Sequence, residues 1–422
     1  MGVEKKQTSE NNILLKRLLL SLGILIFIRI GTFLPVPGID HSQLTFYIQR
    51  HSITRSLVST FSGNDTFVIG LFTLNIFPYI NASILMQLLV SLIPGLAKLQ
   101  KEEGSEGRRT ITRITRIITV IWAFIQSASI AFYLKRALFN WNLFLAFEII
   151  LWLTTGAIIV LWLSELITEY GLGNGASLLI YTNIIASLPN LGKTLILGNI
   201  SNVQISTWLI GAFLFFIAIY GIVLLQEGVR IVPLISSRQL SQTAPFSSEL
   251  PKNNYIPLRF NQAGVMPIIL TTAVLVIPNY INNLGLFPII TLPALGTSSN
   301  ILYWISYFIL ILLFSSFYSN IVLNPKDISK ELQKMAVTIP GIRPGIATTY
   351  YLKQVMKRVT LLGAIMLAIL ATVPNVLETI LQVSSFNGLG TTSLLILVGV
   401  ILDLSREIRS ILLSNIYNDM FD

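Results

Sequence analysis

The chain lacks cysteine altogether and contains few charged residues. Its 422 residues include two histidines, and charged side chains make up 11% of the total against 53% for hydrophobic residues. Without cysteine there is no disulfide framework and no thiol-ligated metal. A soluble domain carries about 25% charged residues, so this chain has too little charge to cover a water-facing surface. The composition therefore excludes soluble globular, disordered and collagen-like proteins and indicates an integral membrane protein with many spans.

Apolar segments long enough to cross a bilayer recur along the sequence. A bilayer core about 30 Å thick needs about 20 apolar residues per helix. We predict an all-α membrane fold with ten spans at residues 14–34, 74–93, 114–134, 143–164, 176–191, 207–226, 263–281, 302–323, 357–374 and 388–404. The fifth and tenth spans are short, and short segments at matching places are typical of two inverted repeats around a central pathway. The predicted halves are residues 1–200 and 201–422.

Lysine and arginine are unevenly distributed across this topology. If the N-terminus lies inside, the outer segments hold only Arg50, Arg55, Lys135, Arg136 and Lys193. Inner loops of membrane proteins carry an excess of lysine and arginine. This rule also explains the net charge of +10. We therefore expect both termini on the inner, cytosolic side.

The segment 53–73 follows the first span. It is too polar to cross the membrane and too apolar to be fully exposed to water. It contains the polar stretch Phe61–Asp65 and the apolar stretch Phe67–Phe72. Irregular backbone at membrane depth persists only where protein buries it or where it lines a watery cavity. Two interpretations remain open at this point: a short re-entrant helix, and a loop on the outer surface.

The sequence contains no pattern typical of a catalytic or metal site. Gly192–Thr194 is not a phosphate-binding loop, because Ser187 occupies the place of the first glycine. The glycines of residues 171–176 follow a span rather than a strand, so they indicate a turn between helices instead of a dinucleotide site. His41 and His51 are too few for a histidine-rich metal centre. We expect no enzymatic activity, no cofactor and no metal.

The predicted spans hold almost no ionisable side chain near their middle. Such groups lie at the span ends instead, at Glu148, Glu165, Glu169, Glu227 and Asp403. Transporters usually place ionisable groups within the membrane, so the pattern favours a pore with an apolar wall. A secondary transporter for small solutes is the alternative, and a lipid-facing insertase or scaffold without a pore is a second one.

Three long segments face the inner side: 98–116, 228–260 and 324–356. Topology alone would explain their basic charge. It does not explain the turns of Ile339–Gly345, which predict that Arg343 stands at a projecting tip. An arginine in that position suits a carboxylate or phosphate on a partner.

Short motifs occur in order along essentially the whole chain. They are Arg29–Gly31, Pro35–Asp40, Phe61–Gly63, Ile76–Ile84, Glu103–Gly104, Gly107–Arg109, Trp162–Leu163, Ile167–Glu169, Gly171–Gly175, Asn261–Pro267, Asn324–Pro325, Ile339–Gly345 and Gly390–Ile396. Together they resemble the SecY family, the central subunits of the protein-conducting channel. The resemblance implies two inverted five-helix halves around a pore that translocates unfolded preproteins. It also implies lateral insertion of apolar segments into the membrane.

The resemblance also assigns the parts of the channel to positions of this chain. The pore ring falls on Ile76, Ile80, Ile180, Ile184, Ile269 and Ile396. The re-entrant plug helix, near residues 56–70, includes Phe61, Ser62, Gly63, Asn64 and Phe67. The lateral gate is held by Ser83, Gln87 and Asn261, and partners dock on Arg108, Arg109, Arg113 and Arg343.

The implied partners are membrane and cytosolic components of the same pathway. They are a SecE-like small membrane subunit, a SecG-like subunit, a SecA-type motor ATPase, the ribosome, preprotein substrates and membrane lipid. The use of isoleucine and asparagine and the short length are similar to plastid-encoded members of the family. We therefore expect the plastid thylakoid membrane first and a bacterial plasma membrane second.

Overall fold

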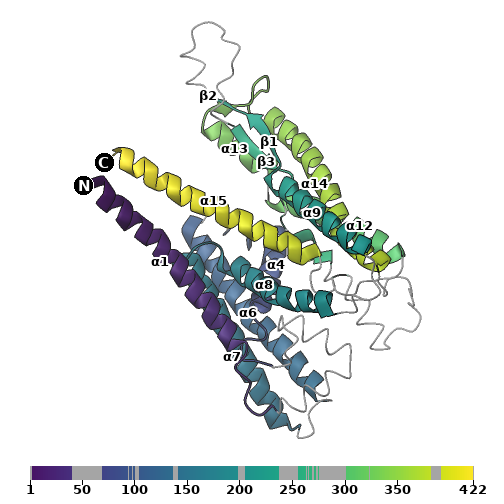
Figure 1. Ribbon diagram of the computed structural model, residues 1–422. Coiled ribbons are helices and arrows are strands. Elements are labelled where there is room, and N and C mark those ends of the chain that lie inside the picture. The colour runs from purple at the N-terminus through teal and green to yellow at the C-terminus, as the bar shows by residue number, and fades with distance from the viewer. Residues whose placement is uncertain are drawn as a thin grey trace. The chain divides into compact units, whose positions relative to one another are not determined.

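The computed structural model describes most of the chain as helices (Figure 1). It describes residues 2–39, 69–93, 104–135, 141–197, 205–236, 255–262, 301–322, 324–381 and 391–421, with some positions in 95–99 and 264–274. The chain divides into two compact units. The first covers Met1–Gly198 and Val400–Asp422, and the second covers Asn199–Gly399. The inverted relation expected for residues 1–200 and 201–422 stays a prediction.

The first unit is built from apolar helices. They are α1 (Gly2–Gly31), α4 (Phe77–Leu92), α6 (Gly104–Leu134), α7 (Leu143–Tyr170), α8 (Gly175–Leu197) and the later part of α15 (Thr391–Phe421). One side of α7 is packed in the interior, where Ile149 and Leu153 are 0% exposed. Its other side exposes large apolar side chains such as Phe144 and Phe147. A helix that is apolar all round suits protein on one side and lipid on the other.

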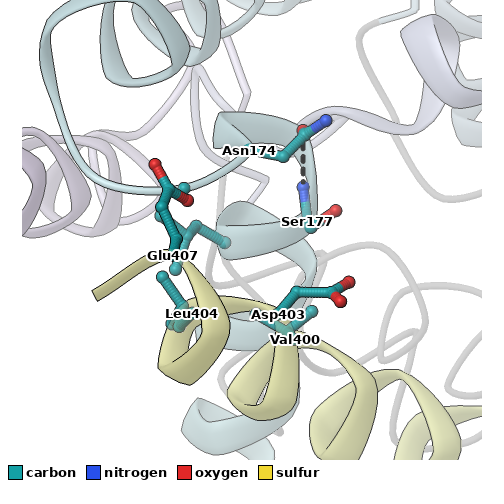
Figure 2. Close-up of a pocket in the computed structure, with 8 residues that line it drawn as sticks. Asn174, Ser177, Val400, Asp403, Leu404 and Glu407 are labelled. Carbon is teal, nitrogen blue, oxygen red and sulfur yellow. Dashed lines mark hydrogen bonds between the residues drawn. The ribbon is translucent and has the colours of Figure 1, made fainter. Parts of the chain in front are cut away.

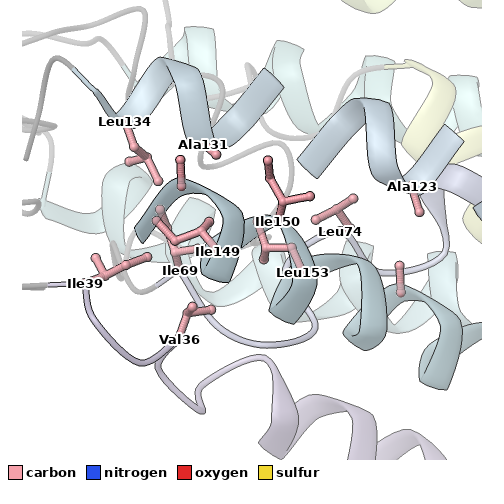
Figure 3. Packing of buried hydrophobic residues seen from close by; sticks show 12 residues of the cluster. Val36, Ile39, Ile69, Leu74, Ala123, Ala131, Leu134, Ile149, Ile150 and Leu153 are labelled. Atoms are coloured by element: carbon pink, nitrogen blue, oxygen red, sulfur yellow. The ribbon is translucent and has the colours of Figure 1, made fainter. Parts of the chain in front are cut away.

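The largest described core of the first unit lies where α6, α7 and the segment before α4 meet (Figure 3). Leu74 packs there against α7, and Ala123 and Ala131 supply the α6 side. Small residues let two membrane helices approach closely. The same contact contains a buried hydrogen bond of 3.0 Å between the Ser127 and Thr154 hydroxyls. Packing and one internal polar bond therefore join α6 to α7.

The segment Ile69–Ile76 is irregular but firmly attached. Its Gly70 forms an antiparallel bridge with Pro35. The Leu71 N–H donates to the Leu34 carbonyl at 2.9 Å, and the Val36 N–H donates to the Ile69 carbonyl at 3.1 Å. These bonds satisfy backbone groups that a helix would pair internally. They fix the point from which α4 begins.

Replacing Gly156 of α7 by alanine is expected to destabilise the first unit. A Cβ atom at this position would overlap the Leu71 carbonyl oxygen, which is backbone and cannot rotate away. Overpacking of this kind costs about 1–3 kcal/mol. Thermal unfolding in detergent measures the effect. Gly23→Ala in α1 is the matched control, because no atom lies within 4 Å of its added Cβ. An equal unfolding temperature for both variants would contradict this packing.

The second unit combines membrane-type helices with short strands. Its elements are α9 (Ile205–Glu227), β1 (Val229–Pro233), β2 (Ile235–Ser236), β3 (Tyr255–Arg259), α12 (Ile301–Val322), α13 (Pro325–Lys334), β4 (Val337–Thr338), α14 (Ile346–Leu381) and the beginning of α15. β1 pairs antiparallel with β3, in a register that sets Val229 opposite Arg259, and β2 pairs antiparallel with β4. Val232, Leu258 and Leu352 lie in a core between these strands, α13 and α14. The segments 228–260 and 324–356, which are predicted to face the inner side, thus contain a small packed substructure.

Apolar helices of the described residues coincide with predicted spans. Three are long enough to cross a membrane, namely Glu106–Phe132, Leu143–Tyr170 and Ile346–Thr372. Shorter apolar helices cover Phe77–Val90, Gly175–Ala186, Phe216–Glu227 and Trp304–Ser319. Each of these stretches overlaps one of the predicted spans. The total of ten spans stays a prediction.

The segment 98–116, which we expected to be a loop on the inner side, is helical from Gly104 onward, where α6 begins. Its placement on the inner side stays a prediction. Gly107 and Thr115 are buried and Ile111 is half-buried between them. Positions four residues apart lie on one helix face, so this part of α6 is an amphipathic extension with one packed side. Span prediction by hydropathy misses such an extension because its other side is charged. The basic side chains of this segment therefore stand on a helix.

Candidate functional site

Four of the six predicted ring isoleucines belong to the first unit, and three of them share one cluster. Ile76 and Ile80 are at the start of α4, and Ile180 is on α8; all three belong to one apolar cluster. Ile184 follows one turn later on α8. Ile76 is 1% exposed and Ile184 is 9% exposed, whereas Ile80 and Ile180 are half-buried.

The other two ring positions belong to the second unit. Ile396 is half-buried on the beginning of α15, and Ile269 lies outside the described residues. The structure therefore brings together the part of the ring that α4 and α8 carry. The closed ring of six stays a prediction.

The start of α4 is defined by local chemistry. Pro78 stands in the first turn, where its missing N–H costs no helical hydrogen bond. The Ile80 N–H donates to the Ile76 carbonyl at 3.1 Å, so the two isoleucines are one helical turn apart and share a face. Asn75 precedes them, and its bond to Asn183 of α8 is a feature that the sequence did not single out.

The plug residues Phe61, Ser62, Gly63, Asn64 and Phe67 lie outside the described residues. The re-entrant helix near residues 56–70 stays a prediction, because the structure describes this segment only from Ile69 onward. It does describe the end of the segment, where Gly70 bridges to Pro35. Any plug would be attached at that bridge.

The predicted gate residues occupy both units. Ser83 and Gln87 are half-buried on α4, and their spacing of four residues places them on one face. Asn261 is half-buried just after β3 in the second unit. Its neighbours are anchored: the Phe260 N–H donates to the Gly228 carbonyl at 2.9 Å, and the Ser319 hydroxyl donates to Gln262 Oε1 at 2.9 Å.

Arg343 is exposed in the loop between β4 and α14. The predicted turns are present, with φ of +75° at Gly341 and +105° at Gly345. The Thr348 hydroxyl donates to the Arg343 carbonyl, and the Ser329 hydroxyl donates to the Gly345 carbonyl, both at 2.9 Å. Hydrogen bonds hold the backbone, so the loop presents an exposed guanidinium from a fixed support. Arg108, Arg109 and Arg113 are also exposed, on α6 of the first unit.

One ion pair of the first unit links two of its helices. The Arg116 Nε donates to Glu165 Oε1 at 2.7 Å, which joins α6 to α7. Asp403 and Glu407 of α15 face the turn before α8, and a small pocket lies between them and Asn174 (Figure 2). Within the described ranges, His, Asp and Glu form no group of three or more suited to a metal ion.

Comparison with solved structures defines the class of this fold. The chain is similar to a SecY structure whose plug domain is described as stabilising the closed state of the translocation channel. The TM-score is 0.64 at 20% identity, covering 94% of this chain and 92% of that one. The fold is therefore that of protein-conducting channels.

Sequence comparison identifies the family. The SecY family pattern matches residues 70–405. The protein translocase subunit SecY of Trieres chinensis is 70% identical over 99% of this chain and 100% of its own length. The corresponding subunit of Guillardia theta is 46% identical over 95% of each chain. The chain belongs to the SecY family. It is a multi-pass membrane protein that serves as a protein-conducting channel, and the small-solute transporter is not favoured.

Proposed function

We propose that Ile76, Ile80, Ile180 and Ile184 form the α4–α8 side of a pore constriction that Ile269 and Ile396 complete. The supporting observation is the apolar cluster that the first three share, in which residues of α4 and α8 pack together with residues of α1 and α7. A narrow apolar ring excludes water and ions when it is empty. It offers no hydrogen bonds, so it can surround an extended preprotein without holding it.

The plug and the lateral gate complete the resting channel. Residues near 56–70 cap the constriction from outside, and spans two and seven separate to release apolar segments into lipid. Ser83, Gln87 and Asn261 hold those spans together in the resting state. A segment of about 20 apolar residues leaves through the gate because transfer into the bilayer core is favourable. The full fold has ten spans in two inverted halves.

The basic inner surface receives the partner that drives translocation. Arg343 offers a planar set of donors that suits carboxylate or phosphate groups. Arg108, Arg109 and Arg113 add positive charge on α6, which favours the phosphates of a ribosome electrostatically. The partners are a SecA-type motor ATPase or a ribosome, together with SecE-like and SecG-like small membrane subunits.

The membrane is the plastid thylakoid, with both termini on the stromal side. The relative from the cryptophyte Guillardia theta supports this choice over a bacterial plasma membrane. The excess of lysine and arginine on the inner side supports the orientation. Accessibility of an introduced N-terminal cysteine to a membrane-impermeant reagent tests it, since the chain has no other cysteine.

Deleting residues 58–67 is expected to make the resting channel leak ions. The deletion removes most of the proposed plug but keeps the described bridge between Pro35 and Gly70. Conductance of vesicles that contain this chain and a SecE-like subunit measures the leak, and preprotein import confirms that the channel works. Import with unchanged conductance would reject the plug, while the absence of import by the unaltered channel would reject the wider proposal.

A further inference from the structure

A hydrogen-bonded pair of asparagines, one buried and one half-buried, joins the residue before Ile76 to α8 beside the proposed constriction. The Nδ2 group of Asn75 donates to Oδ1 of Asn183 at 3.0 Å. Asn75 comes directly before Ile76, and Asn183 comes directly before Ile184. A polar bond between two segments 108 residues apart in the chain therefore lies next to the ring isoleucines on both sides.

Asn75 is fixed in its place by three independent features. Its backbone has φ of +48°, in the left-handed region that few residues other than glycine adopt and that asparagine tolerates. Its side chain is buried, with 2% of the residue exposed. Its Oδ1 accepts the Ile76 N–H at 2.8 Å, so both ends of the amide are used. An amide held in this way has no freedom to seek another partner.

The remaining surroundings of this pair are mostly apolar. Leu74 and Ile76 on either side of Asn75 are 0% and 1% exposed. Hydrophobic contacts have no direction, so they permit α4 to slide or rotate against α8, whereas a hydrogen bond fixes both distance and orientation. A polar bond in such a setting therefore helps to fix the register of the two helices.

We propose that the Asn75–Asn183 hydrogen bond is a clasp that positions the isoleucine pairs of α4 and α8 relative to each other. This inference rests on the proposed pore ring. The clasp holds Ile76 and Ile80 at a fixed height against Ile180 and Ile184, so that their side chains leave no gap in the resting state. The two asparagines are positioning residues, and the isoleucines form the seal.

The test compares three variants with one matched control. Asn183→Ala removes the acceptor from a helical position without disturbing the backbone. Asn75→Gly removes the donor and keeps the left-handed backbone, which glycine adopts freely. The double variant removes both. Thr182→Ala is the control, because the Thr182 hydroxyl donates to the Leu178 carbonyl of its own helix, at 2.8 Å.

The readouts are resting ion conductance and preprotein import of vesicles that contain the channel and a SecE-like subunit, at equal protein content. Each single variant is expected to raise resting conductance about tenfold, because the hydrogen bond between the two side chains is lost. Asn75→Gly also loses the bond from the Ile76 N–H, so it should be the leakier of the two. The double variant should leak no more than the leakier single variant, since both substitutions remove the same bond. Thr182→Ala should behave like the unaltered chain.

Each other outcome has a definite meaning. Additive leaks, or an unchanged leak in Asn183→Ala, would overturn the clasp. If Asn183→Ala fails to accumulate, Asn75→Gly decides alone, since its backbone is unstrained. The proposed ring is judged separately by the Ile80→Gly/Ile184→Gly variant. A leak from that variant with none from the asparagine variants would reject the clasp and keep the ring.

Discussion

The double variant Ile80→Gly/Ile184→Gly is expected to leak ions through the resting channel. Each substitution removes four carbon atoms from the proposed constriction, which leaves a gap that water can fill. A dry apolar constriction blocks ions because water withdraws from it. Lowering the barrier to hydration by about 1.4 kcal/mol is enough for a tenfold rise in conductance. We expect at least this rise, while preprotein import continues.

The control for this variant is its neighbour on the same helix. Ile185 has the same side chain as Ile184, but it is 40% exposed where Ile184 is 9% exposed. Ile185→Gly introduces the same backbone freedom into α8 and leaves the constriction filled. Single-channel recording should find a leak for Ile184→Gly and none for Ile185→Gly. Equal conductance of the two would contradict the assignment of the ring.

Arg343→Glu is expected to stop motor-driven export while the protein still folds and inserts. The side chain is exposed, and the backbone around it is held by Thr348 and Ser329, so the loop keeps its shape when the charge is reversed. Losing one partner of an interfacial charge pair costs at least about 2 kcal/mol, or roughly thirtyfold in affinity. Reversal adds repulsion to that loss. Export of a preprotein in vesicles with the motor ATPase measures the effect.

Two further variants separate charge from position. Arg343→Lys keeps the charge but loses the planar donor set, so partial export is expected. Lys357→Glu makes a charge reversal at another exposed position, three turns along α14, and should leave export near the unaltered level. Normal export by Arg343→Glu would remove this residue from the docking surface.

Hydropathy predicted the helices that are apolar all round. α7 shows why, because Ile149 on its packed side and Phe147 on its exposed side both count as apolar. Hydropathy did not predict how far a helix continues beyond its apolar span. α1 begins at Gly2 and α15 continues to Phe421, well beyond the predicted limits of 14 and 404. In the extension of α6, charged residues on one side conceal the packed side, where Gly107 and Thr115 are buried, from a window average.

The strands and the asparagine pair depend on long-range pairing. β1 and β3 are five residues each, and each strand has one buried residue, Val232 in β1 and Leu258 in β3. Such short segments have little pattern of their own, and the pairing defines them. The hydrogen bond between Asn75 and Asn183 could not be predicted from the sequence, because the two residues are 108 positions apart and become neighbours only in the folded chain. The ring isoleucines were found through family motifs, because isoleucine at a spacing of four is common throughout this chain.

The most direct test of the channel is to ask which side chains a passing preprotein touches. A preprotein stalled during import should crosslink to photoreactive residues at 76, 80, 180, 184, 269 and 396. It should not crosslink to probes at Leu19 of α1 or Phe147 of α7, which are 57% and 55% exposed in positions suited to lipid. Crosslinks at these two exposed positions, with none at the six isoleucines, would contradict the account.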